Sequence, residues 1–579
     1  MKKWMKYVRP YWPYFVIGPL CMIVEVVGEI WMPRLLAMVI NKGNAGTLTV
    51  PGSIGICVTM VILAVVMMLG GVGGAYFGAK ASVNFAADLR DDVYRKIQSF
   101  SFANIDRFST GSLVTRITND VTQLQNFVNM LLRMALRSPG MLIGGLVMAI
   151  SLKPSLATVL AVSIPMMLIL IACVIAVAFP RFQRMQTKID ALNSTVQENI
   201  TNVRVVKSFV REDHEVEKFG SANKNLKEAG LSAMKTMIFM QPIMTFFMYA
   251  TIIVVLWFGH DIVLSGNMEV GDLSAFVAYV NQILMSLMMV TFLLMTSARA
   301  LASARRIREV LEEEPDIVDG EAARRNTALT VNEGRIQFKN VSFRYYKHSA
   351  DKVLDAIDLT IEPRTTVGII GSTGCGKSTL VSLIPRLYDT DEGEVLVDGV
   401  NVRDYSLYQL REGVGMVLQK NVLFSGTIEE NLRWGDQDAT DEELRLAASY
   451  AQADKFVQNF PQQYQTDLEQ GGANVSGGQK QRLCIARALL KKPKILILDD
   501  STSAVDTATE AMIRRAIAEE LSDSTKIIIA QRISSVKDAD QIVVMDDGRI
   551  TGVGTHEELL ANNTEYQEIY YSQMDKKGE

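Results

Sequence analysis

The sequence predicts an all-α domain of six transmembrane helices followed by an α/β domain that contains a phosphate-binding loop. Long apolar runs fill about the first 300 of the 579 residues, whereas the remainder has the mixed composition of a soluble α/β domain. A glycine-rich loop with a lysine lies between apolar stretches at 366–370 and 380–384. The order of strand, glycine-rich loop and helix is typical of a nucleotide-binding domain.

Six apolar segments are long enough to cross about 30 Å of hydrocarbon. They lie near 13–40, 54–78, 136–153, 155–179, 239–263 and 272–298. The third is the weakest, because Pro139 and the pair Gly144–Gly145 interrupt it. The basic N-terminus, Met1–Lys6, precedes a retained span rather than a cleaved signal peptide, since no short apolar core with a small-residue cleavage site follows it.

The distribution of lysine and arginine between the spans predicts their orientation. Segments 1–12, 80–137 and 180–238 carry four, eight and ten such residues. The segments 41–53 and 264–271 carry one and none. Because basic loops stay in the cytoplasm, we expect a multi-pass protein of the plasma membrane with both termini cytoplasmic. The net charge of -4 gives no indication of a nucleic-acid partner.

The two long inner segments have amphipathic helical periodicity, and each contains a break, at 101–108 and at 199–209. Such segments are predicted to be helices that extend from the membrane into the cytosol. Long inner loops are often functional, and these could transmit motion to the C-terminal domain. From periodicity alone, ordinary solvated helical hairpins explain them equally well.

Two acids, Glu25 and Glu29, lie inside the first predicted span. Four residues apart, they are separated by about 6 Å along one helix face. A charge at the membrane centre costs roughly 2.5–3.5 kcal/mol, so both are expected to face protein or water. One interpretation is a site for cationic amphipathic substrates. The other is a structural pair bound to a neighbouring helix, or Glu29 near the outer interface.

The C-terminal half begins after a charged linker. Residues 1–310 are the predicted membrane domain, 311–334 the linker and 335–579 the α/β domain. The five cysteines lack metal-ligand spacing, and two lie in the soluble half, which favours a reducing cytosol for that half.

The glycine-rich loop predicts a phosphate site. Its residues are Gly371, Ser372, Thr373, Gly374, Cys375, Gly376, Lys377, Ser378 and Thr379. Glycines let backbone N–H groups surround phosphate oxygens at the start of a helix. Lys377 is expected to neutralise the β- and γ-phosphates, and the Ser378 hydroxyl is expected to bind Mg²⁺.

Three further motifs belong with this loop. Asp499 and Asp500 end the apolar stretch 495–498, where a second magnesium contact is expected at Asp499. Gln419 follows the strand-like segment 415–418 and could contact the γ-phosphate, Mg²⁺ or the attacking water. A second phosphate-binding nest precedes a helix and has no strand before it, so it is predicted to serve a nucleotide held elsewhere. Its residues are Ser476, Gly477, Gly478 and Gln479.

These motifs together resemble one family. The phosphate loop, Gln419, Ser476–Gln479, Asp499 and Ser503–Asp506 occur in the order and spacing of ABC transporter ATPase domains. Residues 335–570 resemble one such domain. Residues 1–310 resemble the six-span half of a type I ABC exporter, which has the type IV transporter fold.

The resemblance implies ATP and Mg²⁺ as ligands, with Tyr345 stacked on the adenine. It implies a dimer in which two ATP molecules are sandwiched head to tail. Each ATP contacts the phosphate loop of one chain and the Ser-Gly-Gly-Gln motif of the other, and Asp506 contacts the opposite subunit. The breaks near 102–109 and 199–208 resemble the coupling helices that dock on ATPase domains.

The sequence departs from the family pattern at two catalytic positions. Asp500 stands where the family has a glutamate that polarises the attacking water. The shorter side chain places its carboxylate farther from the water, and loss of such a base lowers the rate of hydrolysis about 10²–10⁴-fold. Gln531 stands where the family has a histidine, and glutamine cannot carry a positive charge. The segment 470–474 also lacks the acid and base usual before the glycine in homodimeric exporters.

Both departures fall on the site of this chain's own phosphate loop, whereas the outward-facing motif Ser476–Gln479 is intact. The resemblance therefore implies the subunit with the degenerate site in a bacterial heterodimeric exporter of hydrophobic or cationic amphipathic molecules, of the multidrug type. A homodimer with two slow sites is the alternative for the assembly. A lipid or peptide exporter and an ATP-gated channel or regulator are alternatives for the function.

Overall fold

The computed structural model describes residues 4–325, 328–346, 351–501 and 505–575, and the chain divides into two compact units. The first unit comprises 1–98 and 110–312, and the second comprises 99–109 and 313–579. The short segment 99–109 therefore belongs with the C-terminal unit, although it lies between two helices of the first.

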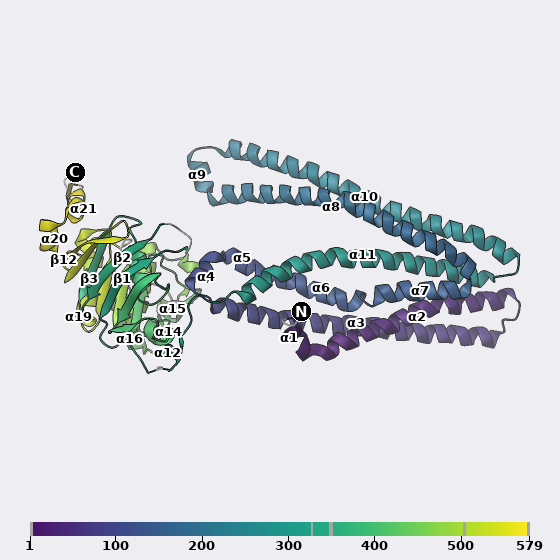
Figure 1. Cartoon of the computed structure of the whole chain (residues 1–579), viewed down its shortest axis with the longest axis horizontal. Coiled ribbons are helices and arrows are strands. Elements are labelled where there is room, and N and C mark those ends of the chain that lie inside the picture. The colour runs from purple at the N-terminus through teal and green to yellow at the C-terminus, as the bar shows by residue number, and fades with distance from the viewer. Residues whose placement is uncertain (1–3, 326–327, 347–350, 502–504, 576–579) are drawn as a thin grey trace. The chain divides into compact units, whose positions relative to one another are not determined.

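The first unit consists of helices (Figure 1). Their bounds are α1 Met5–Val8, α2 Trp12–Asn44, α3 Val50–Gln98, α5 Thr110–Thr115, α6 Val121–Met134, α7 Arg137–Leu152, α8 Pro154–Thr201, α9 Val203–Ser208, α10 Glu212–Leu264 and α11 Val270–Glu312. A π-helical stretch, Arg116–Asp120, joins α5 to α6. Six helical segments in the described chain are long and apolar enough to cross a membrane, which confirms the predicted number.

Five of these helices, α2, α3, α8, α10 and α11, are much longer than the hydrocarbon layer is thick. The 53 residues of α10 correspond to about 80 Å, against about 30 Å of hydrocarbon. Helices α8 and α10 pack against each other as a hairpin with α9 at its tip. Figure 1 shows this tip standing away from α5, α6 and α11 of the same unit.

Small residues let α2 and α3 approach closely. A Cβ atom added at Gly70 of α3 would lie 2.8 Å from the Cys21 carbonyl oxygen of α2. One added at Gly74 would lie 2.2 Å from the Met22 sulfur. Without a hydrophobic force between helices in lipid, such close backbone packing supplies much of the association energy.

In the part of the second unit that the structure describes, the strands form three sheets. Their strands are β1 Ile336–Phe343, β2 Leu354–Ile361, β3 Thr366–Gly371, β4 Glu392–Val397, β5 Val400–Asn401, β6 Val414–Val417, β7 Gly426–Thr427, β8 Asp467–Leu468, β9 Ile495–Asp499, β10 Thr525–Ile529, β11 Gln541–Asp546 and β12 Arg549–Gly554. The largest sheet has the order β12-β11-β3-β10-β9-β6, and β1, β2, β4 and β5 form an antiparallel sheet in the order β2-β1-β4-β5. Strands β11, β3, β10, β9 and β6 are mutually parallel, as expected for an α/β domain.

The helices of this unit are mostly short. Their bounds are α4 Phe102–Arg107, α12 Glu321–Arg325, α13 Lys377–Ser382, α14 Leu407–Gly413, α15 Ile428–Leu432, α16 Asp441–Tyr450, α17 Asp454–Val457, α18 Gly477–Leu490, α19 Thr507–Glu520, α20 His556–Asn562 and α21 Thr564–Asp575. The six-helix membrane domain and the α/β ATPase-type domain that the sequence predicts are both present.

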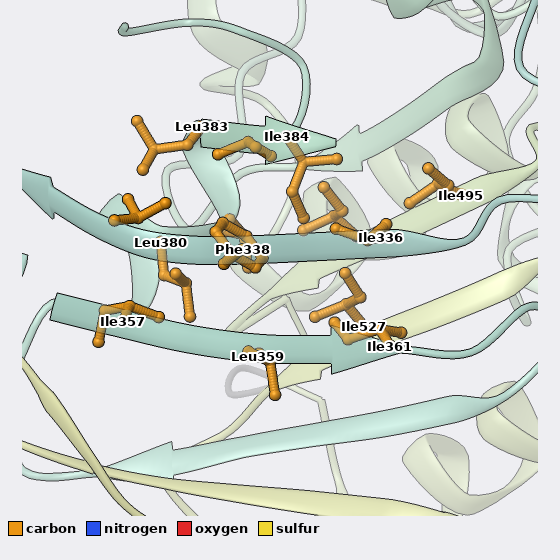
Figure 2. Close-up of a cluster of buried hydrophobic side chains, with 14 of the residues drawn as sticks. Ile336, Phe338, Ile357, Leu359, Ile361, Leu380, Leu383, Ile384, Ile495 and Ile527 are labelled. Carbon is orange, nitrogen blue, oxygen red and sulfur yellow. The ribbon is translucent and has the colours of Figure 1, made fainter. Parts of the chain in front are cut away.

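A single core joins the two larger sheets. Ile336 and Phe338 of β1 and Leu359 of β2 face Leu380 of α13 and Ile527 of β10 (Figure 2). All of these side chains are buried. The core thus fixes α13, which follows the phosphate loop, against both sheets.

Candidate nucleotide-binding site

Four neighbouring parallel strands, β3, β10, β9 and β6, carry the predicted site at their carboxyl ends. The phosphate loop follows β3, and Gln531 lies two residues after β10. Asp499 ends β9, and Gln419 lies two residues after β6. Because the carboxyl ends of parallel strands meet at one sheet edge, segments up to 160 residues apart in sequence come together there.

The phosphate loop has a backbone that requires glycine. Gly374 and Gly376 have φ values of 89° and 98°, in the left-handed region. A Cβ atom at Gly376 would also lie 2.9 Å from the Val353 carbonyl oxygen. Lys377 Nζ donates to the carbonyl oxygens of Gly371 and Ser372, at 2.8 and 2.7 Å, and so lies across the loop.

Asp499 and Ser378, the two predicted magnesium ligands, are hydrogen bonded to each other. The Ser378 hydroxyl donates to Asp499 Oδ1 at 2.9 Å, and Asp499 is 4 % exposed. Burial raises the pKa of Asp499, and the neighbouring Asp500 raises it further. A hydroxyl next to a buried carboxylate fits Mg²⁺, whose other ligands are usually waters and phosphate oxygens.

Asp500 is held by a glutamine. Gln531 Nε2 donates to Asp500 Oδ2 at 2.8 Å, and Gln419 lines the same cavity as these two residues. Asp500 has a φ of 45°, which is uncommon for a residue with a side chain. Burial raises the pKa of Asp500, and the two amides act in the opposite direction. The sequence therefore brings together three predicted catalytic side chains.

An open cavity of about 450 Å³ lies over this edge of the sheet. Eleven of the predicted residues line it: Tyr345, Thr373, Gly374, Gly376, Lys377, Ser378, Thr379, Gln419, Asp499, Asp500 and Gln531. Gly371, Ser372 and Cys375 belong to the same loop but do not line the cavity, and the Cys375 side chain is buried.

The predicted motif Ser476–Gln479 does not line this cavity. Ser476 caps α18: its Oγ accepts from the Gln479 N–H, and Gln479 Oε1 accepts from the Ser476 N–H. Ser476 and Gly477 are exposed, with Gly478 and Gln479 partly so. Asp506 caps α19 and accepts from the Thr509 N–H. Ser503 and Ala504 of the same predicted motif lie outside the described residues.

Tyr345, the predicted adenine platform, is linked to α4 through Tyr388. Tyr345 is 44 % exposed, and its hydroxyl lies 2.9 Å from the Thr379 hydroxyl. The Tyr388 ring packs edge-on against Tyr345 with centroids 5.2 Å apart. Its hydroxyl donates to Asp106 Oδ2 of α4 at 2.9 Å. A side chain expected at the adenine is therefore two contacts away from the short helix in the first inner segment.

In the membrane unit, Glu25 and Glu29 of α2 are both bound by Arg137 of α7. The distances from Arg137 Nη2 are 3.2 Å and 2.6 Å. Gln282 of α11 donates to the Glu29 carbonyl oxygen at 2.9 Å. This geometry is the structural pair bound to a neighbouring helix that the sequence left open. Because Arg137 offsets one of the two carboxylate charges, the pair offers a cationic substrate one net negative charge instead of two.

Sequence reasoning missed three residues. Arg137 was counted with the basic inner loop, but it is the first residue of α7 and contacts two carboxylates of the first span. The position of Arg137 beside an apolar run is the signal in the sequence that could have identified it. Tyr388 and Gln573 lie in no motif. Only contacts identify them: those of Tyr388 with Tyr345 and Asp106, and those of the Gln573 amide with the backbone of Gln531 and Ile533.

A membrane unit joined to a nucleotide-binding unit of this geometry defines the class of ATP-driven membrane transporters. Two family models match the chain, one for the ABC transporter transmembrane region over residues 15–287 and one for the ABC transporter over residues 354–503. The chain belongs to the ABC transporter family. It is a multi-pass membrane protein and an exporter half-transporter, and its ABC ATPase domain implies an ATP-hydrolysing transporter.

Several proteins resemble the whole chain. The uncharacterised ABC transporter ATP-binding protein YfiB of Bacillus subtilis (strain 168) is 38% identical over 582 residues, which cover 100% of this chain and 99% of YfiB. The ATP-dependent lipid A-core flippase of Syntrophus aciditrophicus (strain SB) is 31% identical over 589 residues, which cover 100% of this chain and 95% of the flippase. The structure of a bacterial Atm1-family ABC exporter with ATP bound has a TM-score of 0.78 and 25% identity, and the match covers 98% of each chain.

Proposed function

We propose that this chain is one subunit of a heterodimeric ATP-driven exporter whose own phosphate-loop site retains ATP with little hydrolysis. Hydrolysis occurs mainly at the second site, which combines the partner's phosphate loop with Ser476–Gln479 of this chain. ATP with Mg²⁺ bound at Ser378 and Asp499 closes the two ATPase domains on each other, and the closure switches the membrane domain from inward- to outward-facing.

The observation that carries this proposal is the hydrogen bond between Gln531 and Asp500. A general base must lie within about 2.6–3.2 Å of the proton that it removes. The Asp500 side chain is one methylene shorter than the family's glutamate, and Gln531 already donates a hydrogen bond to its carboxylate. Gln531 can donate one amide proton to a phosphate oxygen but supplies no positive charge. The site therefore suits binding better than hydrolysis.

The motif Ser476–Gln479 supports a role at the other site. Its backbone geometry is held by a capping box within the motif, and it lies outside this chain's own cavity. An exposed, preformed N-terminus of the 14-residue helix α18 is a binding surface for phosphate. In a head-to-tail sandwich it meets the nucleotide on the partner's phosphate loop.

Coupling to transport is proposed to use α4 and α9. The bonds of Asn104 and Arg107 to Glu313 hold α4 in the C-terminal unit. The α9 tip instead exposes the apolar side chains Val205 and Phe209, at 55 % and 73 %. Exposed apolar residues at the tip of an inner hairpin suit a docking surface for the partner's ATPase domain.

The proposed cargo is a hydrophobic or cationic amphipathic molecule moved from the cytosol or inner leaflet of a bacterial plasma membrane. The basic inner segments favour cytoplasmic termini. Relatives named for lipids favour a second candidate cargo. One is the lipid A-core flippase, and another is a fatty acid ABC transporter of Mycobacterium bovis that is 35% identical over 481 residues. Both candidates place an amphiphile at the same membrane domain.

The test is ATPase activity of this chain co-reconstituted with its partner in lipid vesicles. We expect Asp500→Asn to leave at least about half of the activity, because the partner's site performs most turnovers. Changing the partner's catalytic glutamate to glutamine should lower the ATPase activity of the complex by about 10²-fold or more. Gly477→Asp, which fills the outward motif, should have the same effect.

Three outcomes would contradict parts of the proposal. Loss of most activity in Asp500→Asn, with a harmless change in the partner, would overturn the asymmetry. Full activity of this chain without a partner would favour the homodimer. ATP-dependent ion conductance without uptake of a fluorescent amphiphile or lipid into inside-out vesicles would favour the channel.

A further inference from the structure

The C-terminal helix α21 contacts the backbone at both ends of the switch segment, which we define as residues 531–533. Gln573 makes both contacts through its side-chain amide. Its Nε2 donates to the Gln531 carbonyl oxygen at 2.9 Å, and its Oε1 accepts from the Ile533 N–H at 2.9 Å. One side chain thus satisfies a carbonyl and an N–H group two residues apart, as a neighbouring strand would.

Helix α21 is firmly attached at its other end. Tyr566 is fully buried in a cluster with Ile370, the penultimate residue of β3, and Ala530, which precedes Gln531. The Tyr566 hydroxyl lies 2.7 Å from His556 Nδ1, and its N–H donates to Asn563 Oδ1. The helix is therefore anchored to the strands that end at the phosphate loop and at the switch segment.

One contact of Gln573 acts directly on Gln531, the residue that holds Asp500, and the other acts two residues further along, at Ile533. Gln531 is exposed, and no regular strand continues beyond Ile529 to fix its backbone. With its carbonyl bound from α21, Gln531 directs its side chain to Asp500 Oδ2. The sequence of contacts runs from α21 through the switch segment to the floor of the nucleotide cavity.

We propose that Gln573 is a positioning residue for the nucleotide site and that α21 sets how firmly this site retains ATP. Gln573 does not reach the cavity itself and acts through Gln531. Loss of its amide lets the switch segment move away from Asp500 and from the terminal phosphate, so ATP leaves sooner. The proposal requires ATP binding at this loop and does not depend on pairing with a different subunit.

The first test is hydrogen–deuterium exchange of the Ile533 amide in the full-length chain in lipid nanodiscs without nucleotide. Gln573→Met keeps the side-chain length and removes both hydrogen-bonding groups. We expect exchange at Ile533 to be about fivefold faster, since one protecting hydrogen bond is lost. The matched control is Gln567→Met in the same helix, whose amide donates to the Leu560 carbonyl oxygen and does not touch the switch segment. It should leave exchange at Ile533 unchanged.

The second test is the dissociation rate of a fluorescent ATP analogue. Gln573→Met should release it about three- to tenfold faster, and Gln573→Glu, which keeps only the acceptor, should lie in between. In a Gln531→Ala background the change at Gln573 should have no further effect. Unaltered exchange at Ile533 in Gln573→Met would overturn the proposal, as would a full effect on release in the Gln531→Ala background. Neither result would bear on which site of a dimer hydrolyses ATP.

Discussion

Each half of the chain contains a pair of acids, and the two pairs are stabilised in opposite ways. In the membrane unit, Glu25 and Glu29 share one cation, Arg137. In the ATPase unit, Asp499 and Asp500 bind neutral donors, the Ser378 hydroxyl and the Gln531 amide. Both pairs are largely withdrawn from water.

This difference indicates which kind of ligand each acid pair is suited to bind. An acid pair that is already bound by a guanidinium has half of its charge compensated, so it suits helix packing better than capture of a cation. The other acid pair accepts hydrogen bonds from a hydroxyl and an amide, and burial raises the pKa of both of its acids. It is therefore suited to a divalent ion that arrives with a nucleotide.

The largest expected effect is on stability, at Arg137. Arg137→Met leaves two carboxylates in the membrane unit without their cation, and breaking such a buried pair costs about 3–5 kcal/mol. We expect a markedly lower midpoint of thermal unfolding in lipid nanodiscs. The triple variant that adds Glu25→Gln and Glu29→Gln should regain most of the loss, because it removes the uncompensated charges.

Arg34 provides a matched control for this prediction. It binds Asp272 of α11 at 3.1 Å with more solvent around it, since its side chain is 37% exposed. Arg34→Met should lower the free energy of unfolding by about 1 kcal/mol or less. If Arg137→Met were no worse than Arg34→Met, Glu25 and Glu29 would be solvated, and the interpretation of them as a cationic substrate site would gain support.

The next effect is a gain of activity at the degenerate site. The double variant Asp500→Glu with Gln531→His restores the longer acid and a titratable imidazole. We expect hydrolysis at this chain's own site to rise by about 10²-fold, in line with recovery of a general base. The rate is measured in a complex whose partner has its catalytic glutamate changed to glutamine. A rate that stays at background would place the defect elsewhere in the site.

Much of the architecture could be predicted because it depends on strong local patterns. The six spans follow from apolar length, and the four strand ends follow from short apolar runs that stop at Gly371, Asp499 or shortly before Gln419 and Gln531. Parallel pairing then brings these motifs to one edge. The approach of Asp500 to Gln531 was the tertiary consequence of that topology.

The contacts that could not be predicted involve polar residues without a local pattern. Arg137 has the same appearance in sequence as the basic residues of the inner loop, and only its position opposite α2 shows that it is a counter-ion. Gln573 is one of several polar residues in α21, and its role depends on where the helix docks. Tyr388 is half-buried and lies in no motif, so only its contacts with Tyr345 and Asp106 identify it.

A smaller effect is expected at Tyr388, which links the predicted adenine platform to α4. Tyr388→Phe keeps the ring against Tyr345 and loses the hydrogen bond to Asp106, worth about 1 kcal/mol. We expect ATP hydrolysis by the full complex to stay near normal while transport per ATP falls about two- to fivefold. Tyr408→Phe, at a tyrosine that is 72 % exposed, is the control. Equal effects of the two changes would remove Tyr388 from the coupling route.

The smallest expected effect is the pH dependence of stability in the nucleotide-free protein, and it has opposite signs for two acids of the same unit. Burial raises the pKa of Asp499 above its value in the unfolded chain, so the folded protein binds more protons there as the pH falls. This contribution makes the protein more stable as the pH falls from neutral toward the raised pKa. Asp499→Asn should therefore stabilise the protein near neutral pH and lose its advantage on acidification.

Asp506 provides the comparison, because its hydrogen bonds with Thr509 lower its pKa. Its contribution is present above the unfolded pKa and is lost as the pH falls through the folded pKa. Asp506→Asn should thus destabilise the protein slightly at neutral pH and less in acid. Unfolding midpoints of both variants against the unmodified chain, from about pH 7.5 to about pH 5, give the two slopes. A slope of the same sign for both would mean that Asp499 is not desolvated, and its suitability for a bound divalent ion would lose its physical basis.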